Sequence, residues 1–119
     1  MSEYKYIEPV QQGDVTVVTI ANPQDMDRLV IYELGDELSA FAAGQRPEKL
    51  VVDFSRVTYC SSEVINGLLK TRKAVVAYGG EVRLCSLVEE VKRLFIMTNL
   101  DKTIFEIHDT TESALASFN

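Results

Sequence analysis

The chain has 119 residues, the length of one domain, and 46% of them are hydrophobic, as in an ordinary globular protein. The formal net charge of −6 argues against a nucleic-acid binder, because phosphate backbones are bound by clustered Lys and Arg. No apolar run approaches the roughly 20 residues that span a bilayer, and the polar start "MSEYKYIEPV" lacks a signal-peptide core. We therefore expect a soluble, cytoplasmic protein without membrane insertion.

The first third of the chain predicts a hairpin followed by a helix. Two β-rich runs, 4–10 and 15–20, are separated by the polar break "QQGD". Pro9 has no N–H group to donate to a neighbouring strand, so the first strand is expected at an edge. The helix is expected to begin at "NPQDM" and to end before Gly44 and Pro47. Its apolar stripe consists of Met26, Leu29, Val30, Leu34, Leu38 and Phe41.

The middle of the chain predicts a buried strand, an elbow and a second helix. The strand is "KLVVDFS" (49–55), whose almost continuous apolar run is typical of burial on both faces. The helix is expected to end at "YGG", where two glycines supply a stop. Its predicted inward stripe consists of Val64, Ile65, Leu68, Leu69, Val75 and Val76.

The last third predicts two further strands, each followed by a helix. The strands are "EVRLCSL" (81–87) and "TIFEI" (103–107), with the helix "VEEVKRLFIMTN" (88–99) between them. Asp109 and Glu112 resemble a capping box before a final helix. The residues expected to point inward from these two helices are Val88, Val91, Leu94, Phe95, Ala114, Leu115 and Phe118.

These elements predict the order β-β-α-β-α-β-α-β-α in one α/β domain over residues 1–119. Strands joined through single helices should run parallel, because such crossovers are right-handed. The sheet is therefore expected to be mixed and mostly parallel, with the hairpin strand antiparallel at an edge.

The residues do not form a catalytic constellation. Ser61 and Ser62 lie at a strand-to-helix join, but they lack the flanking glycines of a nucleophile elbow. His108, the single histidine, is expected at an exposed strand terminus rather than as a base. Cys60 and Cys85 lack metal-ligand spacing and are predicted to be small core side chains. We expect no enzyme, no cofactor and no metal.

The two serines instead suit the start of a helix. Ser61 fits the N-cap, which leaves Ser62 at the first helical position with its hydroxyl turned outward. Negative charge is stabilised at a helix N-terminus, and a phosphate of about −1.5 to −2 charge would change the surface that a partner contacts. The alternative, that both serines only cap the helix, stays open.

The stretch "LVVDFSRVTYCSSEVINGLLKTRKAVVAYGGEVRLCSLVEEVKRLFIMTNLDKTIFEI" resembles the STAS domain, particularly the anti-sigma factor antagonists, and the resemblance covers roughly residues 5–118. It implies a non-catalytic bacterial regulator of transcription that binds an anti-sigma factor, often a serine-protein kinase, and so frees a sigma factor. In this family the kinase phosphorylates a serine in an Asp-Ser-Ser/Thr-Gly motif, which breaks the complex, and a phosphatase restores it.

Carried over position by position, the motif implies that Ser62 is the phosphorylation candidate. Ser61 stands where the family has Asp, Glu63 where it has Ser/Thr, and Val64 where it has Gly. Ser61 keeps an N-cap acceptor, and Glu63 returns a negative charge to the first turn. Under this hypothesis Glu63 permanently supplies part of the charge that a phosphate would add. Val64 is expected to obstruct close approach by a partner backbone.

The partner surface is expected to centre on the elbow and the exposed side of the helix that follows. Asp53 either orients the elbow through backbone hydrogen bonds or contacts the partner. A rival interpretation is a STAS subunit of another assembly, such as a stressosome-like scaffold or a lipid-transport ABC complex, without phosphorylation switching. An exposed strand edge is compatible with a monomer or a weak dimer. The candidate partner-binding residues are Asp53, Ser61, Ser62, Glu63, Asn66 and Lys70.

Overall fold

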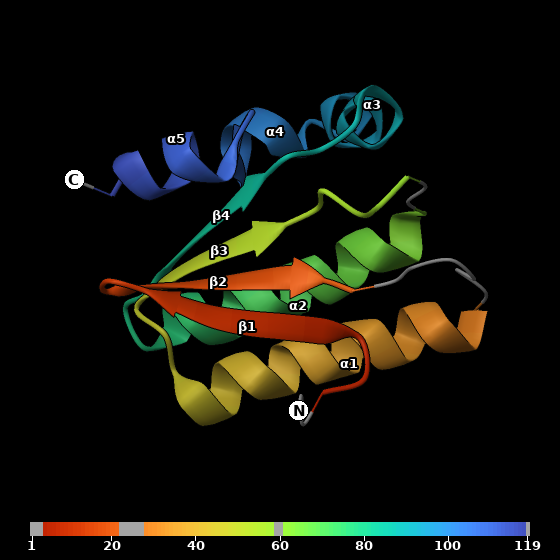
Figure 1. Ribbon diagram of the computed structural model, residues 1–119. Coiled ribbons are helices and arrows are strands. Elements are labelled where there is room, and N and C mark those ends of the chain that lie inside the picture. The colour runs from red at the N-terminus through yellow and green to blue at the C-terminus, as the bar shows by residue number, and fades with distance from the viewer. Residues whose placement is uncertain (1–3, 22–27, 59–60, 119) are drawn as a thin grey trace.

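The computed structural model describes residues 4–21, 28–58 and 61–118 (Figure 1). The expected helix start at "NPQDM", including Met26, lies outside these ranges, as does Cys60; the side chains of Leu29 and Val30 are likewise outside the description. The predicted α/β class and element order are confirmed, with one additional short helix, α4. The elements are β1 (Ile7–Gln12), β2 (Val15–Ile20), α1 (Arg28–Gln45), β3 (Lys49–Asp53), α2 (Ser62–Ala77), β4 (Glu81–Cys85), α3 (Glu89–Met97), α4 (Leu100–Thr103), β5 (Glu106–His108) and α5 (Thr111–Ala116).

The strands form one mixed sheet in the order β1-β2-β3-β4-β5. β1 pairs with β2 antiparallel, and the other three pairings are parallel, as the right-handed crossovers predict. Pro9 lies in the edge strand β1, as expected. The strand extends to Gln12, which pairs with Val15, so the predicted four-residue break is too long. The turn itself is short because Gly13 takes φ +64°, a conformation that glycine adopts without strain.

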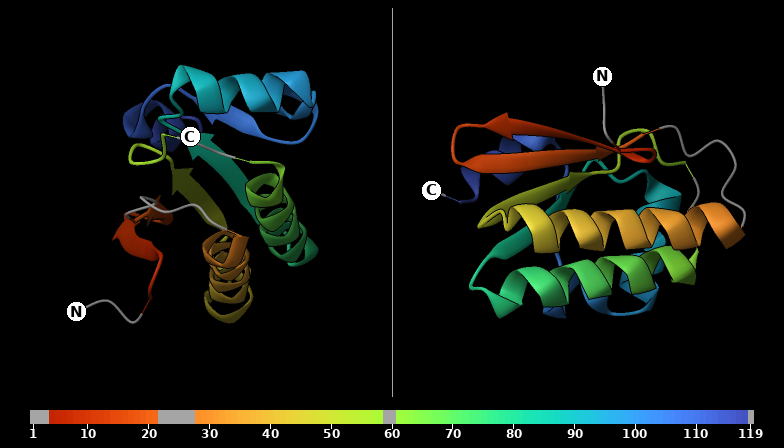
Figure 2. Two further views of the ribbon diagram at one scale, coloured as in Figure 1. Left: turned by 90° about the vertical axis from the view of Figure 1, so that its right-hand side faces the viewer. Right: turned by 90° about the horizontal axis from the view of Figure 1, so that it is seen from below.

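The two faces of the sheet carry different helices. α1, α2 and α3 cover one face, and α5 covers the other (Figure 2). Because successive strand residues point to opposite faces, Val52 joins the large core under α1 and α2, while Val51 faces α5. The core on the α1–α2 side also holds Phe95, whose ring meets Phe54 edge-on at 6.3 Å between centroids. Each face of the central strands is therefore buried.

The inward stripe of α2 differs from the prediction at two positions. Val76 is 46% exposed, whereas Thr71 is fully buried. Thr71 tolerates burial because its hydroxyl donates to the carbonyl of Gly67 at 2.9 Å. Val76 follows the buried Val75 by about 100° around the helix, which turns it away from the sheet. Val88 is also 38% exposed, because it is the N-cap of α3 rather than a helical residue.

The C-terminal region begins its last strand later than predicted. The strand expected at 103–107 starts only at Glu106. The chain before it instead forms α4, which follows a left-handed turn at Asn99 (φ 60°). The capping box is Thr110 with Ser113 rather than Asp109 with Glu112. Thr110 Oγ1 accepts the backbone N–H of Ser113 at 3.0 Å, which starts the helix one residue later.

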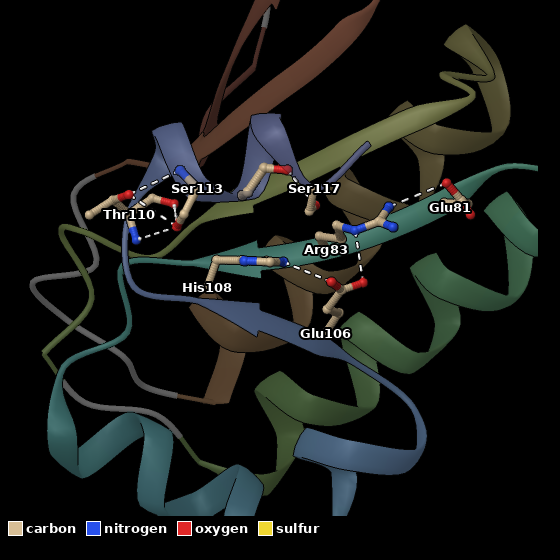
Figure 3. A network of polar contacts seen from close by, with 8 residues as sticks. Glu81, Arg83, Glu106, His108, Thr110, Ser113 and Ser117 are labelled. Atoms are coloured by element: carbon tan, nitrogen blue, oxygen red, sulfur yellow. Dashed lines mark hydrogen bonds and ion pairs between the residues drawn. The ribbon is translucent and has the colours of Figure 1, made fainter. Parts of the chain in front are cut away.

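A network of polar contacts around Arg83 links β4 and β5 (Figure 3). The Arg83 guanidinium donates to Glu106 at 2.9 Å and to Glu81 at 3.3 Å. It also lies 3.9 Å from the centre of the Phe118 ring, just beyond α5. His108 Nε2 lies 3.0 Å from Glu106, and the histidine side chain is only 19% exposed. The expectation of an exposed strand terminus at His108 is therefore wrong.

Candidate functional site

The candidate site begins at the N-terminus of α2. Ser61 is the N-cap, with extended backbone angles (φ −109°, ψ 171°), and Ser62 is the first helical residue. The Ser61 carbonyl accepts the N–H of Val64 at 3.1 Å, so the first turn is closed by the backbone. The buried Ser61 hydroxyl makes no side-chain capping bond, so that part of the capping prediction is wrong. The position of the elbow itself is as predicted.

The residues that follow divide between solvent and core. Ser62 and Glu63 are exposed at the positive end of the α2 dipole, where negative charge is stabilised. Val64 is only 5% exposed and belongs to the hydrophobic core. Its side chain points away from any surface that a partner can reach. The expectation that Val64 obstructs a partner is therefore wrong.

Asp53 ends β3 and organises the start of the β3–α2 connection. Its carboxylate accepts the backbone N–H of Ser55 at 2.9 Å and the Ser55 hydroxyl at 3.1 Å. Thr19 donates to the same carboxylate at 3.2 Å. Strand alternation places Asp53 on the α5 face of the sheet, with Cys85, whose thiol pKa is raised by burial. The geometry therefore favours the orienting role over direct partner contact.

A groove of about 620 Å³ lies between α1 and α2, next to the elbow. The two helices lie side by side and run in the same direction (Figure 2). Gly35 and Gly67 both line the groove, where the backbones of the two helices approach each other closely. A Cβ atom added at Gly67 would lie 2.8 Å from the Cα of Gly35. Neither glycine entered the sequence prediction, although a glycine inside a helix is a signal of close backbone approach.

The walls and rim of the groove combine apolar and charged side chains. Tyr32 of α1 is 72% exposed and forms one wall. Asp36 of α1 and Lys70 of α2 form an ion pair across the rim at 3.4 Å. Glu63, Asn66 and Lys70 all line the groove, because residues three and four apart share one side of a helix. The structure thus brings these three predicted candidates together and places Asp53 on the other side of the sheet.

Within the ranges given above, no cluster of three or more His, Cys, Asp or Glu side chains could hold a metal ion. No helix in the described part of the chain is long and apolar enough to cross a membrane.

The fold and the sequence together define the class of protein. The sequence matches the STAS domain family over residues 6–114, which is most of the chain. The protein belongs to the STAS domain family.

Solved structures share this fold. A STAS-domain anti-sigma-factor antagonist protein from Planctomyces limnophilus is 20% identical, with a TM-score of 0.81 over 95% of this chain and 98% of that one. An anti-sigma factor antagonist from Mycobacterium paratuberculosis is 24% identical, with a TM-score of 0.79 over 93% of this chain and 91% of that one. The anti-sigma factor antagonist SpoIIAA in its unphosphorylated form is 16% identical, with a TM-score of 0.73 over 94% of this chain and 95% of that one.

Proposed function

We propose that this protein is a non-catalytic anti-sigma factor antagonist of the bacterial cytoplasm. It binds an anti-sigma factor of the serine-protein kinase type and thereby releases a sigma factor. The observation that carries the proposal is the exposed Ser62 in the first turn of α2, within a STAS domain similar in fold to known antagonists. The partner surface consists of Ser62, Glu63 and the groove side of α2.

Phosphorylation of Ser62 is the proposed switch. A phosphate would be stabilised locally by the α2 dipole and by the N–H groups of the first turn. It would add about −1.5 to −2 charge directly beside Glu63. A partner that packs over the unmodified hydroxyl would have to desolvate this charge, which is costly unless a cation pairs with it. The modified protein would therefore release its partner, and a phosphatase would restore binding.

Glu63 limits the range of this switch. Its carboxylate already places one negative charge in the first turn of α2. The phosphate would therefore change an acidic surface into a more acidic one, rather than a neutral surface into an acidic one. We propose that the affinity of the unmodified protein is lower, and its response to phosphorylation smaller, than with serine at position 63.

The test begins with the tagged protein and the proteins that co-purify with it. The proposal expects a serine-protein kinase that holds a sigma factor, and it expects that kinase with ATP to modify Ser62, as read by mass spectrometry. Ser62→Asp should weaken the complex at least tenfold, and Glu63→Ser should strengthen it. Glu90→Ser is the matched control, because Glu90 is an exposed acid in the first turn of α3. An unmodified Ser62, after full modification of a control antagonist, would refute the switch.

The departures from the family motif at Ser61 and Val64 favour one alternative function. In that alternative the chain is a constitutive STAS subunit of a scaffold or of a lipid-transport ABC complex. Co-purification of transporter or scaffold subunits, without a kinase or a sigma factor, would support this alternative over the antagonist.

A further inference from the structure

The groove between α1 and α2 is an extension of the elbow rather than a separate feature. Glu63 belongs to the first turn of α2 and also lines the groove. From there the groove follows one side of α2 through Asn66 and Gly67 to Lys70, about two helical turns. A protein that covers Ser62 therefore lies directly beside this groove.

The apolar character of the groove is unusual for a surface exposed to water. Tyr32, which lines the groove, is 72% exposed, and large aromatic side chains are enriched where proteins bind one another. Gly35 and Gly67 contribute no side chains, so the two helix backbones form a shallow floor between the walls. A floor of this kind admits side chains from outside, as in the grooves that bind amphipathic helices.

The charges of the rim indicate the chemistry of the occupant. The lining carries two carboxylates, Asp36 and Glu63, and one ammonium group, that of Lys70, which lies 3.4 Å from Asp36. The whole chain carries a net charge of −6. Electrostatic complementarity therefore favours an occupant with basic residues flanking its apolar side chains.

We propose that the groove receives the apolar side chains of one amphipathic, basic helix of the anti-sigma factor. This inference rests on the proposed function and adds a docking contact to it. The helix lies along α1 and α2, with an apolar side chain over the two glycines and against Tyr32. Its basic residues face Asp36 and Glu63. The contact lies along α2 from Ser62, so it contributes affinity whether or not the switch operates.

The experiment measures the affinity of the co-purified anti-sigma factor for the full chain and for two variants. Tyr32→Ser removes the exposed wall and should weaken binding at least tenfold. Val76→Ser is the matched control, because it removes 46%-exposed apolar surface from α2, outside the groove lining, and it should change affinity less than twofold. Affinity should also fall as salt is raised, because the basic residues pair with exposed acids.

A second measurement does not depend on any variant. In amide NMR spectra of the wild-type chain titrated with the anti-sigma factor, the signals of Gly35 and Gly67 should shift. If wild type binds but Tyr32→Ser binds within twofold of it, or the two glycine signals stay in place, the docking inference is wrong while the proposed function stands. Binding that does not respond to salt would overturn the basic helix. If the wild type binds no anti-sigma factor, the proposed function fails, and this inference fails with it.

Discussion

Replacing Gly67 by alanine tests the close packing of α1 on α2. An ideal Cβ atom at this position would lie 2.8 Å from the Cα of Gly35. Carbon atoms in favourable contact are about 3.5–4.0 Å apart, so the added methyl group is about 0.7 Å too close. The obstructing atom belongs to the backbone of a packed helix. The two helices must therefore separate, because no side chain can rotate away.

The size of the effect follows from two opposing contributions. Overpacking a well-packed contact costs about 1–3 kcal/mol. Alanine is favoured over glycine inside a helix by about 0.5–1 kcal/mol. The mid-range values, about 2 and about 0.75 kcal/mol, predict that Gly67→Ala lowers the free energy of unfolding by about 1 kcal/mol.

Gly44→Ala provides the matched control in the same protein. Gly44 lies near the end of α1, and a Cβ atom there would meet nothing within 4 Å. The control should therefore keep the helix-propensity gain alone and stabilise the fold by up to about 1 kcal/mol. Urea unfolding followed by far-UV circular dichroism measures both variants, with a slope of about 1–3 kcal/mol per molar urea. The Gly67→Ala midpoint should fall and the Gly44→Ala midpoint should rise.

The result that would refute this reasoning is specific. If Gly67→Ala unfolds at the same urea concentration as the wild type or higher, the helices do not approach as closely as the structure indicates. The glycine floor of the groove would then also be in error. If both alanine variants are destabilised equally, the loss does not come from the crossing.

Three further predictions concern other contacts. Glu37→Gln should lower the free energy of unfolding by about 1–2 kcal/mol in the same urea assay. The Glu37 carboxylate accepts the backbone N–H groups of residues 5–7 at 2.7–3.1 Å, and charged acceptors form stronger hydrogen bonds than neutral ones. An unchanged urea midpoint would contradict this prediction. Since burial raises the pKa of the Cys85 thiol, iodoacetamide should modify Cys85 at least a hundredfold more slowly in the native protein than in urea, as read by mass spectrometry. The hydrogen bond from Lys49 lowers the pKa of the Asp14 carboxyl, so its contribution to stability is present at neutral pH and is lost as the pH falls through that lowered pKa. An NMR titration should show Lys49→Met returning the Asp14 pKa toward its ordinary value, and an unmoved pKa would rule the pairing out.

The sheet was predictable from the sequence because its signals are local. The continuous apolar run of β3 identifies a central strand, and Pro9 identifies an edge. Both follow from which backbone groups can pair and which side chains avoid water. The crossover rule then predicts that the strands joined through helices run parallel, whereas the order of the strands comes from the structure.

Helix faces were less predictable because a helix carries several apolar residues that need not all face the core. Hydrophobicity alone does not distinguish Val75, which is fully buried, from Val76, which is not. The buried position of Thr71 depends on a hydrogen bond to the carbonyl four residues earlier, which spacing cannot reveal. The capping box failed for a related reason, since Thr110 and Asp109 are both good N-cap residues and only the backbone decides between them.

The candidate site was predictable in part. The position of Ser62 in the first turn follows from the spacing of apolar residues, which changes from that of a strand to that of a helix at this point of the sequence. The groove was not predictable, because it depends on two glycines 32 positions apart that meet only after the helices pack. The role of Asp53 was left between two options, and only the donors around its carboxylate favour the orienting one.

The departures at the elbow have consequences that depend on which way each side chain points. A residue larger than glycine at position 64 could have blocked a partner, but Val64 is buried and instead fastens the first turn of α2 to the core. The replacement at Ser61 is also turned inward, since its hydroxyl oxygen is buried. Of the four motif positions, Ser62 and Glu63 are the exposed ones. Under the proposed function, the permanent charge of Glu63 is therefore the departure expected to change the response to phosphorylation.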